Sequence, residues 1–498
     1  MKQLKRLVGD TAIYGVSSIL GRLLNWLLVP LYVVYFKPSE YAIVVELFAF
    51  IALFNIIYTL GFETTYFRFS SQQKQTDQNY FDLAIAMIFL NCLFLGSILI
   101  FFAEDLALLL QYEGKGYLIV WCVLILSLDA MAAIPFARLR ILREGKKFAA
   151  FKLLNIGLNI GLNLFFIVYL PVQVTQDPHS LLAGIYFPEL GAGHIFLSNL
   201  MANSIYLLLF SGAFLRLKFT FSVNMLKPFL AYAAPLVILQ LAGVINEMFS
   251  RQSLKYLLPK GFYPDLSNAA ALGVFGACFK LSIFMALAVQ AYKFAFEPFF
   301  FNHAHETNSK QLYASAMNGF IIFGGLSWMV ISLMLPEIAQ LVFGAHSPYL
   351  DGLIIVPVLL GSGLLMGIFF NLSVWYKLTD HTSIGAIISV SGAILTIGLN
   401  VSLIPILGFM GSAWASLISW FFMTLLSYFI GKRYFPIKYQ LSKGCFYFIY
   451  AVLATAMIVN LELSLLSRYG LGLGLVGFYL GLVYWIEIKS SNKEIEYH

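Results

Sequence analysis

The chain has 498 residues, of which 60% are hydrophobic and only 11% are charged. An ordinary soluble domain has roughly a quarter of its residues charged, so this composition excludes a soluble protein. The formal net charge of +7 could indicate a nucleic-acid partner, but the cations lie in short loops between apolar segments, where membrane proteins carry them. The sequence therefore predicts a membrane protein that binds no nucleic acid.

Apolar segments of about 20 residues, the length that a helix needs to cross the hydrocarbon, recur along the whole chain. The first is too long for a signal peptide and lacks a small-residue cleavage site, so we expect it to be a retained first span. We predict an all-α membrane protein with about fourteen transmembrane helices. They lie near 11–35, 41–61, 81–102, 116–137, 149–170, 193–214, 228–249, 269–292, 314–335, 352–375, 383–404, 410–430, 442–460 and 469–487.

Lys and Arg are concentrated in the loops that share one side of the membrane with both ends of the chain. The densest of these loops follows the fourth segment and contains Arg138, Arg140, Arg143, Lys146 and Lys147. Because cytoplasmic loops carry the excess of Lys and Arg, both termini are predicted to be cytoplasmic.

A short internal repeat indicates two related halves. Ile160-Gly161-Leu162-Asn163 recurs as Ile397-Gly398-Leu399-Asn400, each time in the fifth segment of a six-segment block that follows a basic loop. We therefore predict two six-helix lobes, at 1–220 and 221–431, with two extra helices and a cytoplasmic tail at 432–498. Such halves normally enclose a central cavity that opens alternately to either side.

When the loop cations are set aside, Arg22 in the first segment and Lys280 in the eighth remain. A cation in the hydrocarbon is costly, so it normally faces a wet cavity or an acidic partner. A guanidinium can bind phosphate oxygens in bidentate fashion, and an ammonium adds a point charge. The pair predicts an anionic substrate such as a diphosphate. The alternative is that Arg22 pairs with Glu46, and Lys280 with a nearby acid, to join helices.

Acidic residues inside the segments are candidates for coupling transport to a proton or a sodium ion. Asp129 has no cation one helical turn away, and Glu46 and Glu247 are the other candidates. Glu247 also lies four residues before Arg251, a spacing that is typical of a local salt bridge. Asn25, near Arg22, can donate hydrogen bonds to sugar hydroxyls or to another helix.

Motifs of catalysis or cofactor binding are missing from the sequence. It contains no Walker loop, G-x-S-x-G or H-E-x-x-H. His303 and His305 precede Glu306, but spacing fixes no third ligand of a metal. We expect no metal, no cofactor and no enzyme activity.

Four stretches resemble the Wzx-like polysaccharide-biosynthesis flippases of the multidrug/oligosaccharidyl-lipid/polysaccharide (MOP) exporter superfamily. They are GRLLNWLLVPLY (21–32), GFETTYFRF (61–69), AYKFAFEPFFF (291–301) and NVSLIPILGFMGSAWASLISW (400–420). The resemblance implies a multi-pass protein of the bacterial inner membrane that moves an undecaprenyl-diphosphate-linked oligosaccharide by alternating access. It implies that Arg22 and Lys280 contact the diphosphate, and that Arg68 receives substrate at the cytoplasmic mouth. Polysaccharide assembly proteins would be partners besides the membrane lipids.

Two other functions stay open at this point. A cation-coupled multidrug exporter of the same superfamily would share the fold, although such exporters usually have twelve spans. A multi-span polymerase or glycosyltransferase would need a large outer loop or an acidic metal site. The longest outer loop, 171–192, contains no Lys or Arg to hold a diphosphate donor.

Overall fold

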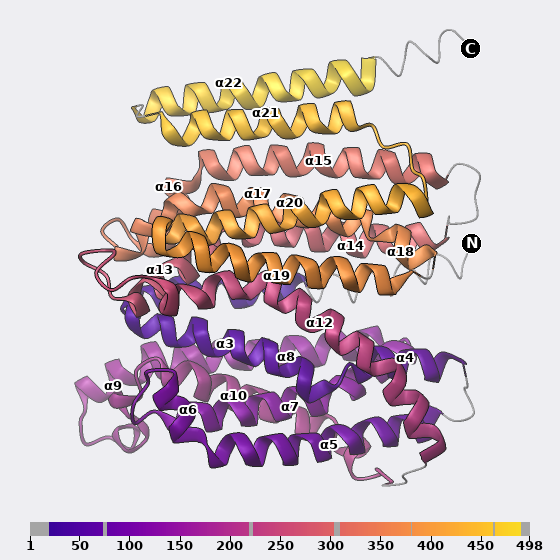
Figure 1. The fold of residues 1–498 in the computed structure, drawn as a ribbon. Coiled ribbons are helices and arrows are strands. Elements are labelled where there is room, and N and C mark those ends of the chain that lie inside the picture. Colours follow the sequence, from indigo (N-terminus) through magenta and orange to yellow (C-terminus); the bar gives the residue numbers. More distant parts are fainter. Residues whose placement is uncertain are drawn as a thin grey trace. The chain divides into compact units, whose positions relative to one another are not determined.

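The computed structural model describes residues 19–72, 77–218, 223–302, 309–379, 381–461 and 464–489. Helices make up nearly all of these residues, and no β-strand occurs among them (Figure 1). Contacts divide the chain into two compact units, Met1–Met248 (unit 1) and Phe249–His498 (unit 2). The repeat boundary near residue 220 stays a prediction.

The helices agree with the predicted spans. Among the described residues, 11 helices are long and apolar enough to cross a membrane, or up to 13 if each bent pair counts as one span. A shorter apolar helix, Ile19–Tyr35, covers the described part of the first predicted segment. The all-helical, many-span fold class is therefore confirmed.

Unit 1 is built around α7 (Gly116–Ile141), which packs against α3, α5, α6 and α10. The helix α12 passes from unit 1 into unit 2. The other elements of unit 1 are α2 (Leu28–Tyr35), α3 (Pro38–Thr59), α4 (Phe62–Gln72), α5 (Asp77–Phe101), α6 (Ala103–Leu109), α8 (Gly145–Leu164), the π-helical turn η2 (Phe165–Tyr169), α9 (Leu170–Gln176), η3 (Leu181–Ile185), η4 (Pro188–Leu190), α10 (Gly193–Leu209), α11 (Ser211–Phe214) and α12 (Val223–Leu257).

Unit 2 is built around α17 (Val356–Leu372), which packs against α13, α14, α15 and α20. The last two helices pack on α15 as an added layer, drawn in yellow in Figure 1. The other elements are α13 (Asn268–Leu281), α14 (Ile283–Asn302), α15 (Ser309–Leu333), α16 (Leu335–Phe343), η5 (Pro348–Ile355), α18 (Val374–Leu378), α19 (Thr382–Leu407), α20 (Phe409–Tyr434), α21 (Leu441–Asn460), α22 (Leu465–Val483) and η6 (Tyr484–Lys489).

The two units repeat several features in the same order. The third spans α5 and α15 both have 25 residues, and after one residue each is followed by a short helix, α6 or α16. The helices α8 and α19 begin equally far before the shared Ile-Gly-Leu-Asn motif. The Asn of each motif is fully buried and hydrogen-bonded within its unit: Asn163 accepts from Tyr32 Oη at 3.1 Å, and Asn400 donates to Ser250 Oγ at 3.0 Å. The two units therefore share these local features, and the repeat of two six-helix lobes stays a prediction.

The second span is broken between α3 and α4. Leu60 and Gly61 there have positive φ angles of 53° and 66°. Such a break frees backbone carbonyls, which must find other donors inside a membrane. Asn91 of α5 is such a donor. Its Nδ2 donates to the carbonyls of Ile57 and Tyr58 at 2.9 and 3.1 Å.

We expect Asn91→Leu to lower the free energy of unfolding by about 1–3 kcal/mol, because two partly buried carbonyls lose their donor. The thermal unfolding midpoint of the purified protein measures this. Asn460→Leu is the control, since that exposed side chain bonds a carbonyl within its own helix at 2.9 Å. Equal midpoints for the two variants would contradict the assigned role of Asn91.

The hairpin of α19 and α20 explains the Gly-x-x-Gly-Ser-Ala part of the last resembling stretch. Gly408 turns the chain with φ 55° and ψ −126°, a conformation essentially limited to glycine. At Gly411 a Cβ atom would overlap the carbonyl of Leu403 and lie 2.8 Å from the backbone nitrogen of Ile404. Next to it, Ser412 Oγ donates to the carbonyl of Ser250. The small residues therefore allow α19, α20 and α12 to pack closely against one another.

Candidate functional site

Arg22 and Asn25 lie on the helix Ile19–Tyr35, before the turn at Leu27, and both side chains are exposed. Within the described part of the chain, Arg22 has no ion-pair or hydrogen-bond partner. The alternative pairing with Glu46 is therefore not observed. An exposed, unpaired guanidinium in an apolar span is available to an anion.

Glu46 is fully buried and accepts a hydrogen bond from the phenol of Tyr112, which follows α6. This contact ties α3 to the segment before α7. It gives Glu46 a structural role in unit 1, and ion coupling by Glu46 stays a prediction.

Lys280 lies in the last turn of α13, where the eighth span bends by 45° before α14 begins at Ile283. Its side chain is half-buried. A cation at a helix C-terminus is stabilised by the helix dipole, and broken membrane helices often hold ligands at such ends. Lys280 belongs to unit 2, whereas the other six predicted residues belong to unit 1.

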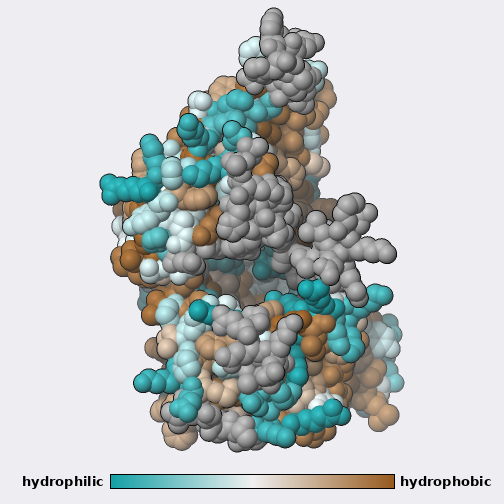
Figure 2. All heavy atoms as spheres, turned by 90° about the vertical axis from the view of Figure 1, so that its right-hand side faces the viewer, coloured by the Kyte–Doolittle hydropathy of each residue, from teal (hydrophilic) through white to brown (hydrophobic). Residues whose placement is uncertain are grey.

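Arg68 lies on α4 at the end of the helices that is predicted to be cytoplasmic. Its side chain is exposed, and its Cζ is 4.2 Å from the ring centroid of Tyr232 on α12. Hydrophilic side chains gather on this end of the molecule, which Figure 2 views directly. Arg140 of α7 forms an ion pair with Glu63 of α4 nearby in the fold, so α4 is held from two sides.

Asp129, near the middle of α7, lies in a polar cluster that joins three helices. Its Oδ1 accepts a hydrogen bond from Asn203 Nδ2 of α10 at 3.0 Å. Asn155 of α8 donates in turn to Asn203 Oδ1 at 2.8 Å. Lys152 of α8 interacts with the Asp129 carboxylate electrostatically.

Sequence reasoning missed Lys152 because it lies near a basic loop and was counted as a loop cation. It also assigned Arg251 and Lys255 to an outer loop, whereas both side chains are buried on α12 in unit 2, only 8% and 3% exposed. Arg251 Cζ lies 4.2 Å from the ring centroid of Phe279, the neighbour of Lys280. The signal that could have placed these two cations inside a helix is that no Gly or Pro occurs at residues 249–258, and α12 does continue to Leu257.

Glu247 is exposed on α12, and within the described residues it has no ion-pair or hydrogen-bond partner. The predicted local salt bridge with Arg251 is therefore not formed. The described residues contain no group of three His, Cys, Asp or Glu side chains that could hold a metal ion. His303, His305 and Glu306 lie outside the described residues.

Many apolar helices around charged residues define this chain as a multi-pass integral membrane protein. No protein-family model and no curated protein sequence matches it. Among solved structures, the lipid II flippase MurJ in an inward closed conformation is similar over 94% of this chain and 98% of that chain, with a TM-score of 0.70 and 14% identity.

Multidrug transporters have the same architecture. An inward-facing multidrug resistance MATE family transporter of the MOP superfamily is similar over 83% of this chain and 94% of that chain, with a TM-score of 0.63 and 15% identity. A Vibrio cholerae MATE transporter is similar over 87% and 96%, with a TM-score of 0.55 and 13% identity. At these identities the likeness concerns the fold alone, which this chain shares with these flippase and multidrug transporter structures.

Proposed function

We propose that the protein is a flippase that moves a lipid-diphosphate-linked oligosaccharide across the bacterial cytoplasmic membrane by alternating access. The observation that carries this proposal is Arg22, an exposed guanidinium in an apolar helix without an acidic partner among the described residues. A diphosphate supplies the planar arrays of oxygen atoms that a guanidinium binds in bidentate fashion.

The charges suit an anion better than a cationic drug. Arg22 and Lys280 bind the diphosphate, Asn25 donates to the sugar, and Arg68 meets the substrate at the cytoplasmic mouth. Asp129, Glu46 and Glu247 are the candidates for ion coupling, and Asp129 is favoured by its polar surroundings. Both termini are cytoplasmic, and the two lobes lie at 1–220 and 221–431.

The length of the chain supports a flippase over a drug exporter. The MurJ structure covers 94% of this chain, whereas the MATE structures cover 83% and 87%. The two extra helices, α21 and α22, are joined to the core of unit 2 by an ion pair between Arg468 and Glu337. Lys443 and Glu487 form a second ion pair between α21 and the end of the last span at 3.3 Å.

The test is reconstitution in liposomes with a fluorescent polyprenyl-diphosphate oligosaccharide, whose outer-leaflet fraction is read with an impermeant quencher. We expect protein-dependent movement of this lipid and no efflux of cationic dyes. Dye efflux without lipid movement would show that the protein is a multidrug exporter and not a flippase. Transfer of sugar to an acceptor lipid by the purified protein would show that the protein is an enzyme.

A further inference from the structure

Lys152 is half-buried on α8 in unit 1, close to two aromatic rings. Its Nζ is 4.2 Å from the ring centroid of Phe136 on α7 and 5.5 Å from that of Tyr206 on α10. Within the described residues this ammonium has no hydrogen-bond acceptor and no direct ion pair. Cation–π attraction to the rings therefore holds it in place.

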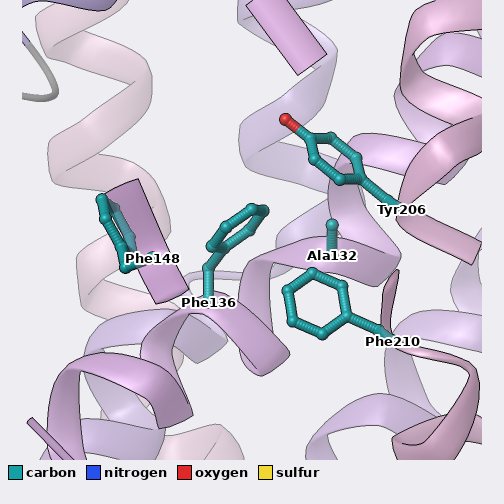
Figure 3. Close-up of a cluster of buried hydrophobic side chains, with 5 residues drawn as sticks. All are labelled: Ala132, Phe136, Phe148, Tyr206 and Phe210. Carbon is teal, nitrogen blue, oxygen red and sulfur yellow. The ribbon is translucent and has the colours of Figure 1, made fainter. Parts of the chain in front are cut away.

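The rings belong to a buried cluster that closes one side of the ammonium. Figure 3 shows Phe136 and Tyr206 packed with Ala132, Phe148 and Phe210. The ring centroids of Phe136 and Phe148 are 5.3 Å apart, and those of Phe136 and Tyr206 are also 5.3 Å apart. Such edge-to-face packing leaves little freedom to the rings that contact Lys152.

A polar layer lies next to this aromatic layer, about one helical turn away on α8 and α10 and about two turns from Phe136 on α7. Asn155 follows Lys152 by three residues, and Asn203 precedes Tyr206 by three, so each pair lies on one helix face. Asp129 lies in the same layer and is bonded to Asn203. The Lys152 ammonium therefore contacts the aromatic layer and lies next to the polar layer of carboxylate and amide groups.

Lys152 and Asp129 compensate each other's charge. Asn203 and Asn155 link Asp129 to the helix face of α8 that carries Lys152, so the carboxylate and the ammonium attract each other across α7 and α8. Arg140 is a second cation that acts on Lys152. Arg140 itself is ion-paired with Glu63. The polar layer therefore already contains one positive charge for its one carboxylate.

We propose that Lys152 is the resident cation of Asp129, a tethered ammonium that excludes sodium from this site. Two like charges about 6 Å apart at an effective dielectric constant of about 20 repel enough to weaken binding by about a hundredfold. Amide and carboxylate oxygens would otherwise suit a small hard cation. This proposal rests on the proposed function only because it concerns the ion that drives transport. The experiment that tests it uses no lipid-linked substrate.

The test is the thermal unfolding midpoint of the full chain in detergent, in NaCl and in choline chloride at equal ionic strength. We expect wild type to unfold at the same temperature in both salts. Lys152→Met keeps the apolar stem over the rings but removes the charge, so it should gain a sodium-specific rise of about 2 °C or more. Adding Asp129→Asn should abolish that gain.

Lys147→Met is the matched control, because Lys147 is an exposed residue on the same helix, paired with Glu144 at 2.8 Å. It should show no sodium response. A sodium response in wild type that Asp129→Asn removes would overturn the proposal, and this arm needs no Lys152 variant to fold. Absence of a sodium response in both Lys152→Met and Lys152→Ala would overturn it too. Neither result depends on whether the cargo is a lipid-linked sugar.

Discussion

Arg22→Ala should lower the initial rate of lipid-diphosphate-oligosaccharide translocation by about ten- to a hundredfold. A hydrogen bond to a charged group contributes about 1.5–3 kcal/mol, and a guanidinium that binds two phosphate oxygens contributes at least one such bond. Arg22 is exposed and has no competing acid among the described residues, so the variant leaves no acid uncompensated there. Folding should therefore be preserved while transport falls.

The liposome quenching assay measures this rate, with the protein amount and the unfolding midpoint checked for each variant. Arg22→Lys keeps the charge but loses the planar fork, so we expect an intermediate rate. Arg216→Ala is the control, because Arg216 is an exposed cation outside the spans. Equal rates for Arg22→Ala and Arg216→Ala would reject the guanidinium as a substrate contact.

Gly411→Ala should destabilise the protein by about 3 kcal/mol, the largest stability effect expected here from a single added methyl group. The added Cβ would overlap the carbonyl of Leu403, which is backbone and has no rotamer to change. The turn at Gly408 fixes the distance between α19 and α20, so the two helices must separate or bend. The buried contact of Ser412 with the carbonyl of Ser250 should weaken at the same time.

Gly398→Ala is the natural comparison. Gly398 lies on α19, and a Cβ there would meet nothing within 4 Å. Because Ala favours a helix over Gly by about 1 kcal/mol, this variant should be neutral or slightly more stable. Thermal unfolding of both purified variants tests the pair, and similar midpoints would show that the hairpin is not as tightly packed as Gly411 indicates.

The spans could be predicted from the sequence because hydropathy and the length of the hydrocarbon determine them almost alone. The continuation of the second helix beyond the break at Leu60 and Gly61 could not, because Glu63 and Arg68 give α4 the composition of a loop. Only the hydrogen bonds of Asn91 reveal how the freed carbonyls are satisfied. The fold class was therefore predictable and the interruptions were not.

Some of the candidate site residues could be predicted from the sequence and others could not. Arg22 could be found because nothing near it in the sequence is charged. Lys152 could not, because hydropathy does not tell which face of a helix a residue near a loop occupies. The partner of Glu46 is Tyr112, a residue 66 positions away that no spacing rule connects to it.

Because α12 begins in unit 1 and ends in unit 2, it affects when unit 1 can finish folding during synthesis of the chain. Its first part completes the aromatic packing of unit 1: Phe229 is fully buried, and its ring centroid lies 5.0 Å from that of Phe62 and 5.5 Å from that of Phe69. A nascent chain that ends near residue 220 therefore lacks a core side chain of its own N-terminal half. During synthesis, that half is complete only after the ribosome has passed residue 248, so gene truncations or fusions placed at the repeat boundary would release an unfinished unit into the membrane.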